Sequence, residues 1–298
     1  MKWEGQRQSD NVEDRRAGGG GLGGGGFRIG GRGIGLGTVA LAVVGGLIFG
    51  VNPLTLLGML SGGGGGEAPS SQQAPAQRPP ANDALASFVS TVLADTEDVW
   101  RAQFKQANMT YSEPKLRLFR GSEPTACGTG QAAMGPFYCP GDQKVYIDLG
   151  FFDVMKQRLG APGDFAQAYV IAHEVGHHVQ NLMGITGKVD AMRGRGSEAQ
   201  QNALSVRLEL QADCFAGVWA YNAANGSDPL IEAITDQDIA EGLDAAAKVG
   251  DDYIQKKFQG RVSPEAWTHG SSAQRQKWFT TGYRTGEMTD CDTFSGSI

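Results

Sequence analysis

Apolar positions recur with a helical period in several long stretches of the chain and alternate in only two short ones. Residues 163–182 and 197–225 are the longest periodic stretches, and each predicts a helix. Alternation over 115–119 and 144–149 predicts two strands, followed by a short helix over 150–159. Further helices are expected over 83–108, 235–253 and 271–279, with a glycine-rich loop over 184–196. We therefore expect a mostly helical α+β domain with a small sheet.

The first 82 residues differ from the rest in composition. Residues 1–33 are rich in glycine and polar side chains with almost nothing to bury, which predicts a disordered head. Residues 34–60 contain no charged side chain, and a helix needs about 20 apolar residues to cross a bilayer. A Gly/Pro-rich linker is expected over 61–82, and the folded domain over 83–298.

Charge suggests how the apolar stretch is oriented. The first 33 residues carry six basic and four acidic side chains, whereas the whole chain has a formal net charge of −6. A basic head predicts a single uncleaved transmembrane helix with the N-terminus in the cytoplasm and the domain outside it. A cleaved signal peptide is the alternative, but its positive head would be short. The acidic balance argues against a nucleic-acid partner.

The helix expected over 163–182 carries His173-Glu174-Val175-Gly176-His177. On a helix the two histidines lie one turn and about 40° apart, so both imidazoles can bind one cation. Glu174 lies near enough to act as a general base, which is the H-E-x-x-H arrangement of zinc hydrolases. A chance match is the alternative. Gly176 costs the helix about 1 kcal/mol and leaves room for a close approach to its backbone. His178 faces away and is expected to be a packing or surface residue.

A catalytic zinc needs a third protein ligand. Glu209 and Asp213 are four residues apart on the helix expected over 197–225, among apolar neighbours. Two acids on one face repel unless positive charge lies opposite, and a zinc site supplies it. Glu209 is therefore predicted to bind the metal, and Asp213 to accept the other ring N–H of a ligand histidine, most simply His173. A solvated acidic face is the alternative.

All four cysteines follow the apolar stretch, in a compartment expected to be oxidising. Three pairings are open, one of which joins Cys127 to Cys139 and Cys214 to Cys291. A thiolate zinc site is the alternative, although the chain has no C-x-x-C pair. Cys214 could also be a small buried apolar residue.

One histidine lies far from the motif. His269 precedes the last predicted helix, in a Gly/Ser turn from which its side chain can project into a cleft. A zinc hydrolase needs a hydrogen-bond donor for the oxyanion that develops on the scissile carbonyl, and His269 or Tyr283 could serve. A structural histidine is the alternative.

His173–His177 followed by Glu209–Asp213 resembles the HExxH and ExxxD motifs of the gluzincin metallopeptidases. The chain is still more similar to the bacterial neutral zinc metallopeptidase family, over 126–128, 135–140, 145–149 and 268–275. That resemblance covers about residues 83–290 and the N-terminal anchor. It implies a zincin-like domain with one Zn²⁺ per chain, a protein or peptide substrate, and anchoring in the bacterial inner membrane with the catalytic domain in the periplasm.

Together these expectations describe a membrane-anchored metalloendopeptidase. Zinc on His173, His177 and Glu209 would lower the pKa of its bound water towards about 7, and Glu174 would take the proton and pass it to the leaving amine. The strand over 145–149 is expected to be a sheet edge to which a peptide adds. A binding or scaffold module with a structural zinc, and a non-peptidase zinc hydrolase, are the rival interpretations.

Overall fold

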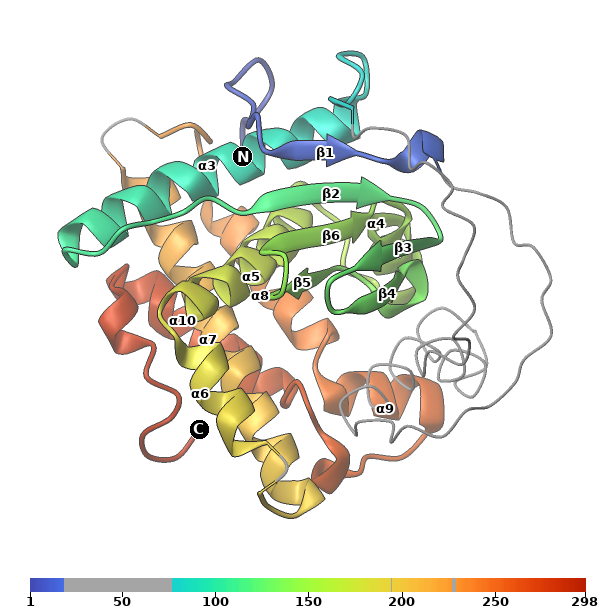
Figure 1. The fold of residues 1–298 in the computed structure, drawn as a ribbon, viewed down its shortest axis with the longest axis vertical. Helices are drawn as coiled ribbons and strands as arrows, with labels where there is room; N and C mark the ends of the chain where they lie inside the picture. Colours follow the sequence, from blue (N-terminus) through green and yellow to red (C-terminus); the bar gives the residue numbers. More distant parts are fainter. Residues whose placement is uncertain (19–76, 194, 227–228) are drawn as a thin grey trace.

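The structure is a computed structural model that describes residues 1–18, 77–193, 195–226 and 229–298. Helices surround one small sheet and a separate hairpin (Figure 1), which confirms the mostly helical α+β class. The described α-helices are α3 (Ala84–Gln106), α4 (Gly150–Val154), α5 (Asp164–Leu182), α6 (Ile185–Met192), α7 (Glu198–Asn225), α8 (Asp236–Lys248), α9 (Asp251–Gln259) and α10 (Ser272–Thr285). A π-helix, Met155–Leu159, continues α4, as the helix predicted over 150–159 requires. The strands are β1 (Val12–Asp14), β2 (Lys115–Phe119), β3 (Ser122–Thr125), β4 (Gly128–Gln131), β5 (Phe137–Cys139) and β6 (Lys144–Asp148).

The main sheet has the order β1-β2-β6-β5. Strands β1, β2 and β6 run parallel, and β5 runs antiparallel to β6. Leu116 and Leu118 of β2 lie opposite Val145 and Ile147 of β6, and all four are buried against the helices. Because β6 lies between β2 and β5, the expectation that residues 145–149 form a sheet edge is wrong. Among the described strands, β5 occupies that edge.

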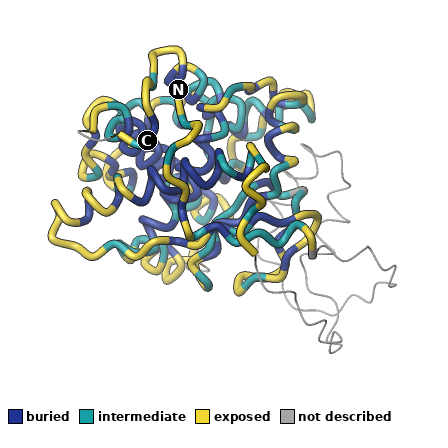
Figure 2. The backbone as a smooth tube through the Cα atoms, turned by 90° about the horizontal axis from the view of Figure 1, so that it is seen from above, coloured by how far each residue is buried: buried dark blue, intermediate teal, exposed yellow. Residues whose placement is uncertain are grey.

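Helix α5 lies at the centre of the helical layer, in contact with α3, α7 and α8 (Figure 2 shows the buried interior). Among the described helices, α7 and α10 make the most extensive contact. A Cβ on Gly217 would lie 2.1 Å from the Phe279 carbonyl oxygen, and one on Gly282 would lie 1.9 Å from that of Cys214. Glycine at both positions lets the two backbones touch, so α10 is fixed close to the part of α7 that carries Glu209.

Two predicted elements need correction. The helix expected over 235–253 is two helices, α8 and α9, divided at Val249 and Gly250. A Cβ on Gly250 would lie 2.5 Å from the Ser272 amide nitrogen, so the break lets the start of α10 approach. The loop expected over 184–196 contains the short helix α6. This helix was not predicted because glycines interrupt the helical period of apolar residues in this stretch.

The N-terminus also departs from expectation. Residues 1–18, expected to be disordered, are folded onto the domain, and β1 pairs with β2. A three-residue strand can join an existing sheet edge without a core of its own, so composition gave no sign of it. The rest of the predicted head, the predicted transmembrane helix and most of the linker lie outside the described residues. Within the described ranges, no helix has the length and apolar character needed to cross a membrane.

Candidate metal centre

The site is built on two helices that lie unusually close together. A Cβ on Gly176 of α5 would lie 3.0 Å from the carbonyl oxygen of Ala212 on α7. The close approach that this glycine was expected to permit is therefore that of the helix that carries Glu209 and Asp213. It brings the two sequence motifs face to face.

The side chains of His173, His177 and Glu209 converge on one point. His173 Nε2 lies 3.1 Å from Glu209 Oε2, and His177 Nε2 lies 3.5 Å from Glu209 Oε1. One ligand atom from each residue lies within 4.8 Å of the others. Tetrahedral zinc with bonds of about 2.0–2.1 Å separates its ligands by about 3.3 Å. The two imidazoles and the carboxylate therefore fit a zinc ion in donor type and in spacing.

His173 is held from behind by a buried polar network. Its Nδ1 lies 2.9 Å from Asp213 Oδ1, which also accepts a hydrogen bond of 2.5 Å from the Tyr169 hydroxyl. Arg275 donates from Nε to Asp213 Oδ2 at 2.8 Å and from Nη2 to Oδ1 at 2.9 Å. Asp213 thus fixes the tautomer that leaves His173 Nε2 available to a metal. Sequence reasoning found Asp213 but missed Tyr169 and Arg275.

His177 has a partner of a different kind. Its Nδ1 lies 2.8 Å from the side-chain oxygen of Gln180, one turn further along α5. The Gln180 amide donates to the Leu208 carbonyl at 2.7 Å and to Gln211 at 3.1 Å, and Gln211 donates to the Cys291 carbonyl at 2.9 Å. This buried line of amides joins the second histidine to the C-terminal tail. A polar Gln180 inside the apolar run was the one available sequence signal.

Glu174 is buried beside the two histidines, yet no hydrogen bond to its carboxylate occurs within the described residues. Burial raises the pKa of Glu174, against the opposing influence of the His177 and His173 charges. A carboxylate with a raised pKa and no internal partner is suited to take up and release a proton.

Charge interactions within the site shift the pKa values of His173 and Glu209 in opposite directions. Burial lowers the pKa of His173, but the Asp213 charge and the hydrogen bonds to Asp213 and Glu209 outweigh it and raise the pKa to about 10. Burial likewise favours a neutral Glu209, but the His177 charge and the contacts with both histidines hold the pKa of Glu209 well below its usual value. Without a metal the three groups therefore form an ion-pair cluster, and the histidines must lose protons when a metal binds.

His269 is held in a loop close to this cluster. Its Nδ1 lies 3.2 Å from Asp251 Oδ1, and Asp251 Oδ2 accepts the backbone N–H groups of residues 268, 269 and 270. Burial alone would lower the pKa of His269, but the Asp251 carboxylate outweighs burial and raises this pKa above its usual value. The charge of His269 in turn helps to lower the pKa of Glu209. Within the described residues, Nε2 of His269 makes no hydrogen bond. Sequence reasoning missed Asp251.

The other predicted residues lie away from the cluster. Tyr283 stacks on Phe279, with ring centroids 6.4 Å apart, and none of its described contacts involves the metal ligands. His178 is fully buried between the Tyr138 hydroxyl and the Ser112 carbonyl. The cysteines form two disulfides, Cys127–Cys139 and Cys214–Cys291, which is one of the three pairings left open.

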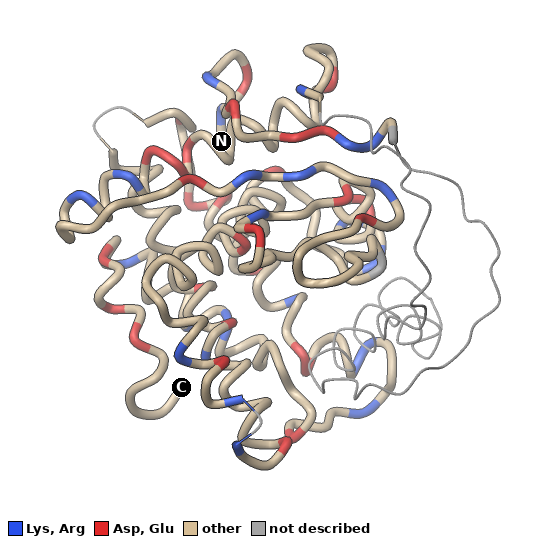
Figure 3. The backbone as a smooth tube through the Cα atoms, viewed as in Figure 1, with Lys and Arg blue, Asp and Glu red and all other residues tan. Residues whose placement is uncertain are grey.

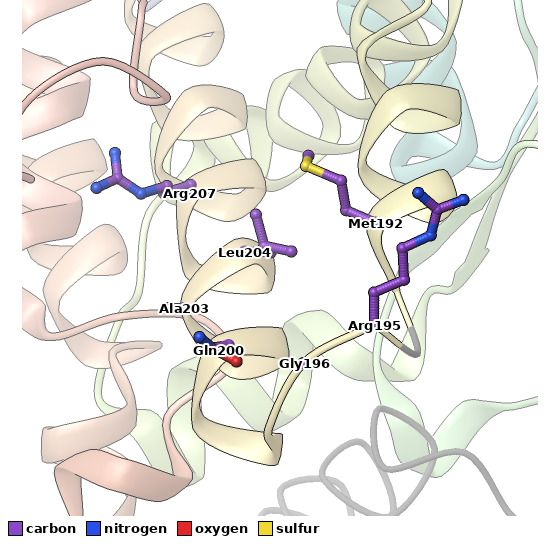
Figure 4. Close-up of a pocket in the computed structure, with 7 residues that line it drawn as sticks. All are labelled: Met192, Arg195, Gly196, Gln200, Ala203, Leu204 and Arg207. Carbon is purple, nitrogen blue, oxygen red and sulfur yellow. The ribbon is translucent and has the colours of Figure 1, made fainter.

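The hollow in Figure 4 is not part of this site. Its volume is about 360 Å³, and it is lined by Met192, Arg195, Gly196, Gln200, Ala203, Leu204 and Arg207. The lining residues of α7 lie on the opposite side of the helix from Glu209, as their spacing requires. No predicted ligand lines it.

The fold and the site define an α+β domain with an H-E-x-x-H helix and a third acidic ligand on a neighbouring helix. A sequence profile of the family described as "Putative neutral zinc metallopeptidase" matches residues 1–294, and the chain belongs to this family. Zinc is the metal that the family description implies.

Relatives extend over the whole chain. The uncharacterized protein YpfJ of Escherichia coli (strain K12) is 48% identical over 301 residues, which cover 100% of both chains. An uncharacterized protein of Mycobacterium tuberculosis (strain H37Rv) is 48% identical over 216 residues, 70% of this chain and 72% of its own length. No solved structure shows a significant match.

Proposed function

We propose that the protein is a zinc-dependent endopeptidase in which His173, His177 and Glu209 bind one Zn²⁺. One observation supports this most strongly: three zinc-type donor atoms lie within 4.8 Å of one another, while the buried Glu174 beside them has no hydrogen-bond partner among the described residues. A purely structural zinc site does not require a buried carboxylate that lacks a hydrogen-bond partner within the described part of the chain. The scaffold interpretation leaves Glu174 unexplained.

The roles of the side chains follow from their surroundings. Zinc held at this site would polarise the scissile carbonyl and lower the pKa of a water molecule. Glu174 would take that proton and deliver it to the leaving amine, for which its raised pKa is suited. His269, oriented by Asp251 and with Nε2 unpaired among the described residues, would donate to the oxyanion of the transition state. Tyr283 has no support in the structure for this role.

The substrate is proposed to be an extended peptide that pairs with β5. This strand is antiparallel to β6 and lies at the sheet edge, and the Tyr138 hydroxyl bonds His178 of α5 at 2.9 Å. The edge is thereby held against the helix that carries the motif. Main-chain hydrogen bonds to such an edge would bind many sequences.

We further propose that the domain works outside the cytoplasm and is held at the membrane by the apolar residues 34–60. The two disulfides support an oxidising compartment. The absence of any charged side chain over 34–60 supports contact with lipid.

The test compares purified wild-type protein with Glu174→Gln on a peptide library, with cleaved termini read by mass spectrometry. Glu287→Gln, which changes an exposed glutamate far along the chain, is the matched control. We expect new termini from wild type and Glu287→Gln, and at least about 10²-fold fewer from Glu174→Gln. Zinc-loaded protein that cleaves nothing, or Glu174→Gln that cleaves normally, would reject the peptidase assignment.

A further inference from the structure

The N-terminal segment (residues 1–18) is built into the sheet. Val12 of β1 is buried opposite Leu116 of β2, and the pairing continues beyond the strand. The Leu116 amide donates to the Asn11 carbonyl at 2.9 Å, and the Arg15 amide donates to the Leu118 carbonyl at 2.8 Å. Figure 1 shows β1 alongside β2 as the outermost strand.

A buried acid in the domain depends on this segment. Glu97 of α3 is only 2% exposed. Its carboxylate accepts hydrogen bonds from the Ser9 hydroxyl at 2.5 Å and the Asn11 side-chain amide at 2.8 Å, and Arg7 lies 3.9 Å away. Every partner described for this carboxylate comes from the N-terminal segment. The segment thus supplies the hydrogen bonds that a carboxylate needs when it is buried, because an unsatisfied buried carboxylate is strongly unfavourable.

Charged side chains of the segment are also complementary to those of the sheet. Glu13 accepts hydrogen bonds of 2.9 Å from Arg117 of β2 and from Lys144 of β6. Figure 3 shows the acidic residues of β1 beside the basic residues of β2. Nearer the start of the segment the contact is apolar: the Trp3 ring packs edge-on against Phe88 of α3, with ring centroids 5.3 Å apart.

The end of the N-terminal segment also contacts the first described residues of the domain. Asp14 and Gln77 exchange backbone hydrogen bonds, 2.7 Å in one direction and 3.2 Å in the other. Arg16 lies 2.7 Å from Asp83, the residue that caps the first turn of α3. Residues 14–16 and residues 77–83, which flank the range that the structure does not describe, are thus joined to each other as well as to the domain.

We propose that the N-terminal segment is a permanent part of the folded domain and lies on the same side of the membrane as residues 77–298. A chain that crosses a bilayer once has its ends on opposite sides, and these contacts could not then form. The proposal differs from the topology expected from the sequence, in which the N-terminus is cytoplasmic and the domain lies outside. The family profile begins at residue 1, so the segment belongs to what the family shares.

The topology is tested in cells that express the full chain with one added cysteine, Gln8→Cys or Ala199→Cys. Both residues are exposed, one in the segment and one in the domain. A membrane-impermeant maleimide is applied before and after permeabilisation, with the unmodified chain as the background control. We expect both positions to react under the same condition. Reaction of Ala199→Cys in intact cells, with Gln8→Cys reacting only after permeabilisation, would overturn the proposal.

The docking itself is tested by hydrogen exchange on the purified full chain. The amides of Ser9, Asp14 and Arg15 donate to backbone carbonyls and should exchange at least about 10²-fold slower than in an unstructured peptide. The double variant Ser9→Ala/Asn11→Ala should lower Tm by about 2–8 °C, whereas Gln8→Ala should not. Unprotected amides in the wild type, or a double variant as stable as Gln8→Ala, would show that the segment is not part of the fold.

Discussion

Two histidines of the site are each held by a buried aspartate at Nδ1, and the surroundings of those aspartates differ. Asp213, the partner of His173, is bonded by Arg275 and Tyr169, and all of these groups come from helices. Asp251, the partner of His269, is held by three consecutive backbone N–H groups of a loop. Asp213 therefore has a second charged partner, the Arg275 guanidinium, whereas Asp251 has backbone N–H groups in addition to His269.

The difference matters for what each histidine can do. His173 Nε2 already lies 3.1 Å from Glu209, and His173 lies on a helix fixed by close packing, as a metal ligand requires. His269 Nε2 is unpaired among the described residues and lies on a loop, so it can meet a group that exists only in the transition state. In the proposed mechanism His173 serves metal binding and His269 serves the rate of the reaction, so either function should be lost without the other.

Of the changes to these two Asp–His pairs, His269→Ala is expected to have the largest effect on the rate. Removal of one oxyanion donor should lower kcat by about 10²–10³-fold with KM nearly unchanged. Zinc content should stay at the wild-type level, because His269 is not a ligand. Steady-state kinetics and metal analysis on one preparation provide both values. A variant that loses its zinc would mean that His269 serves the metal instead.

Asp213→Asn should affect the other Asp–His pair, and with it the binding of zinc by His173. Asparagine keeps the shape and a hydrogen-bonding oxygen but loses the charge that orients His173. Zinc affinity should fall by about 10–100-fold, as measured by competition with a chelating dye. Glu209→Gln, measured in parallel, should bind zinc still more weakly. If Asp213→Asn loses zinc entirely while Glu209→Gln binds normally, the two acids have exchanged roles.

A smaller effect is expected from pH. Because the pKa of His173 is raised to about 10, the metal-free site keeps that proton throughout the neutral range, and zinc must displace it. Apparent zinc affinity should therefore rise with pH, by at least about tenfold per unit between pH 6 and pH 8. Asp213→Asn removes the main cause of the raised pKa and should flatten this slope. A wild-type affinity independent of pH would exclude a protonated His173.

The site residues that could be predicted from the sequence differ from the others in how they reach the site. His173, Glu174, His177, Glu209 and Asp213 lie on two strongly periodic helices, so spacing alone placed them on common faces. Arg275 and Asp251 reach the site only through the packing of α10 and the loop before it. No local pattern distinguishes a buried arginine or aspartate of this kind from a solvated one.

Strands were harder to predict than helices. The alternation over 115–119 and 144–149 identified β2 and β6, but β5 and β1 have three residues each, too few for a period. They form because a neighbouring strand offers them unpaired backbone groups. The position of residues 145–149 in the middle of the sheet was therefore out of reach, because both flanking strands had to be known first.

Zinc content per chain, measured on three preparations of the full protein, tests the ligand set and the role of Glu174 most directly. Wild type and Glu174→Gln should each hold about one equivalent after dialysis, and Glu209→Ala should hold far less. Of the three, only wild type should cleave peptides. A full equivalent of zinc in Glu209→Ala, or its loss from Glu174→Gln, would contradict the assignment of these two glutamates.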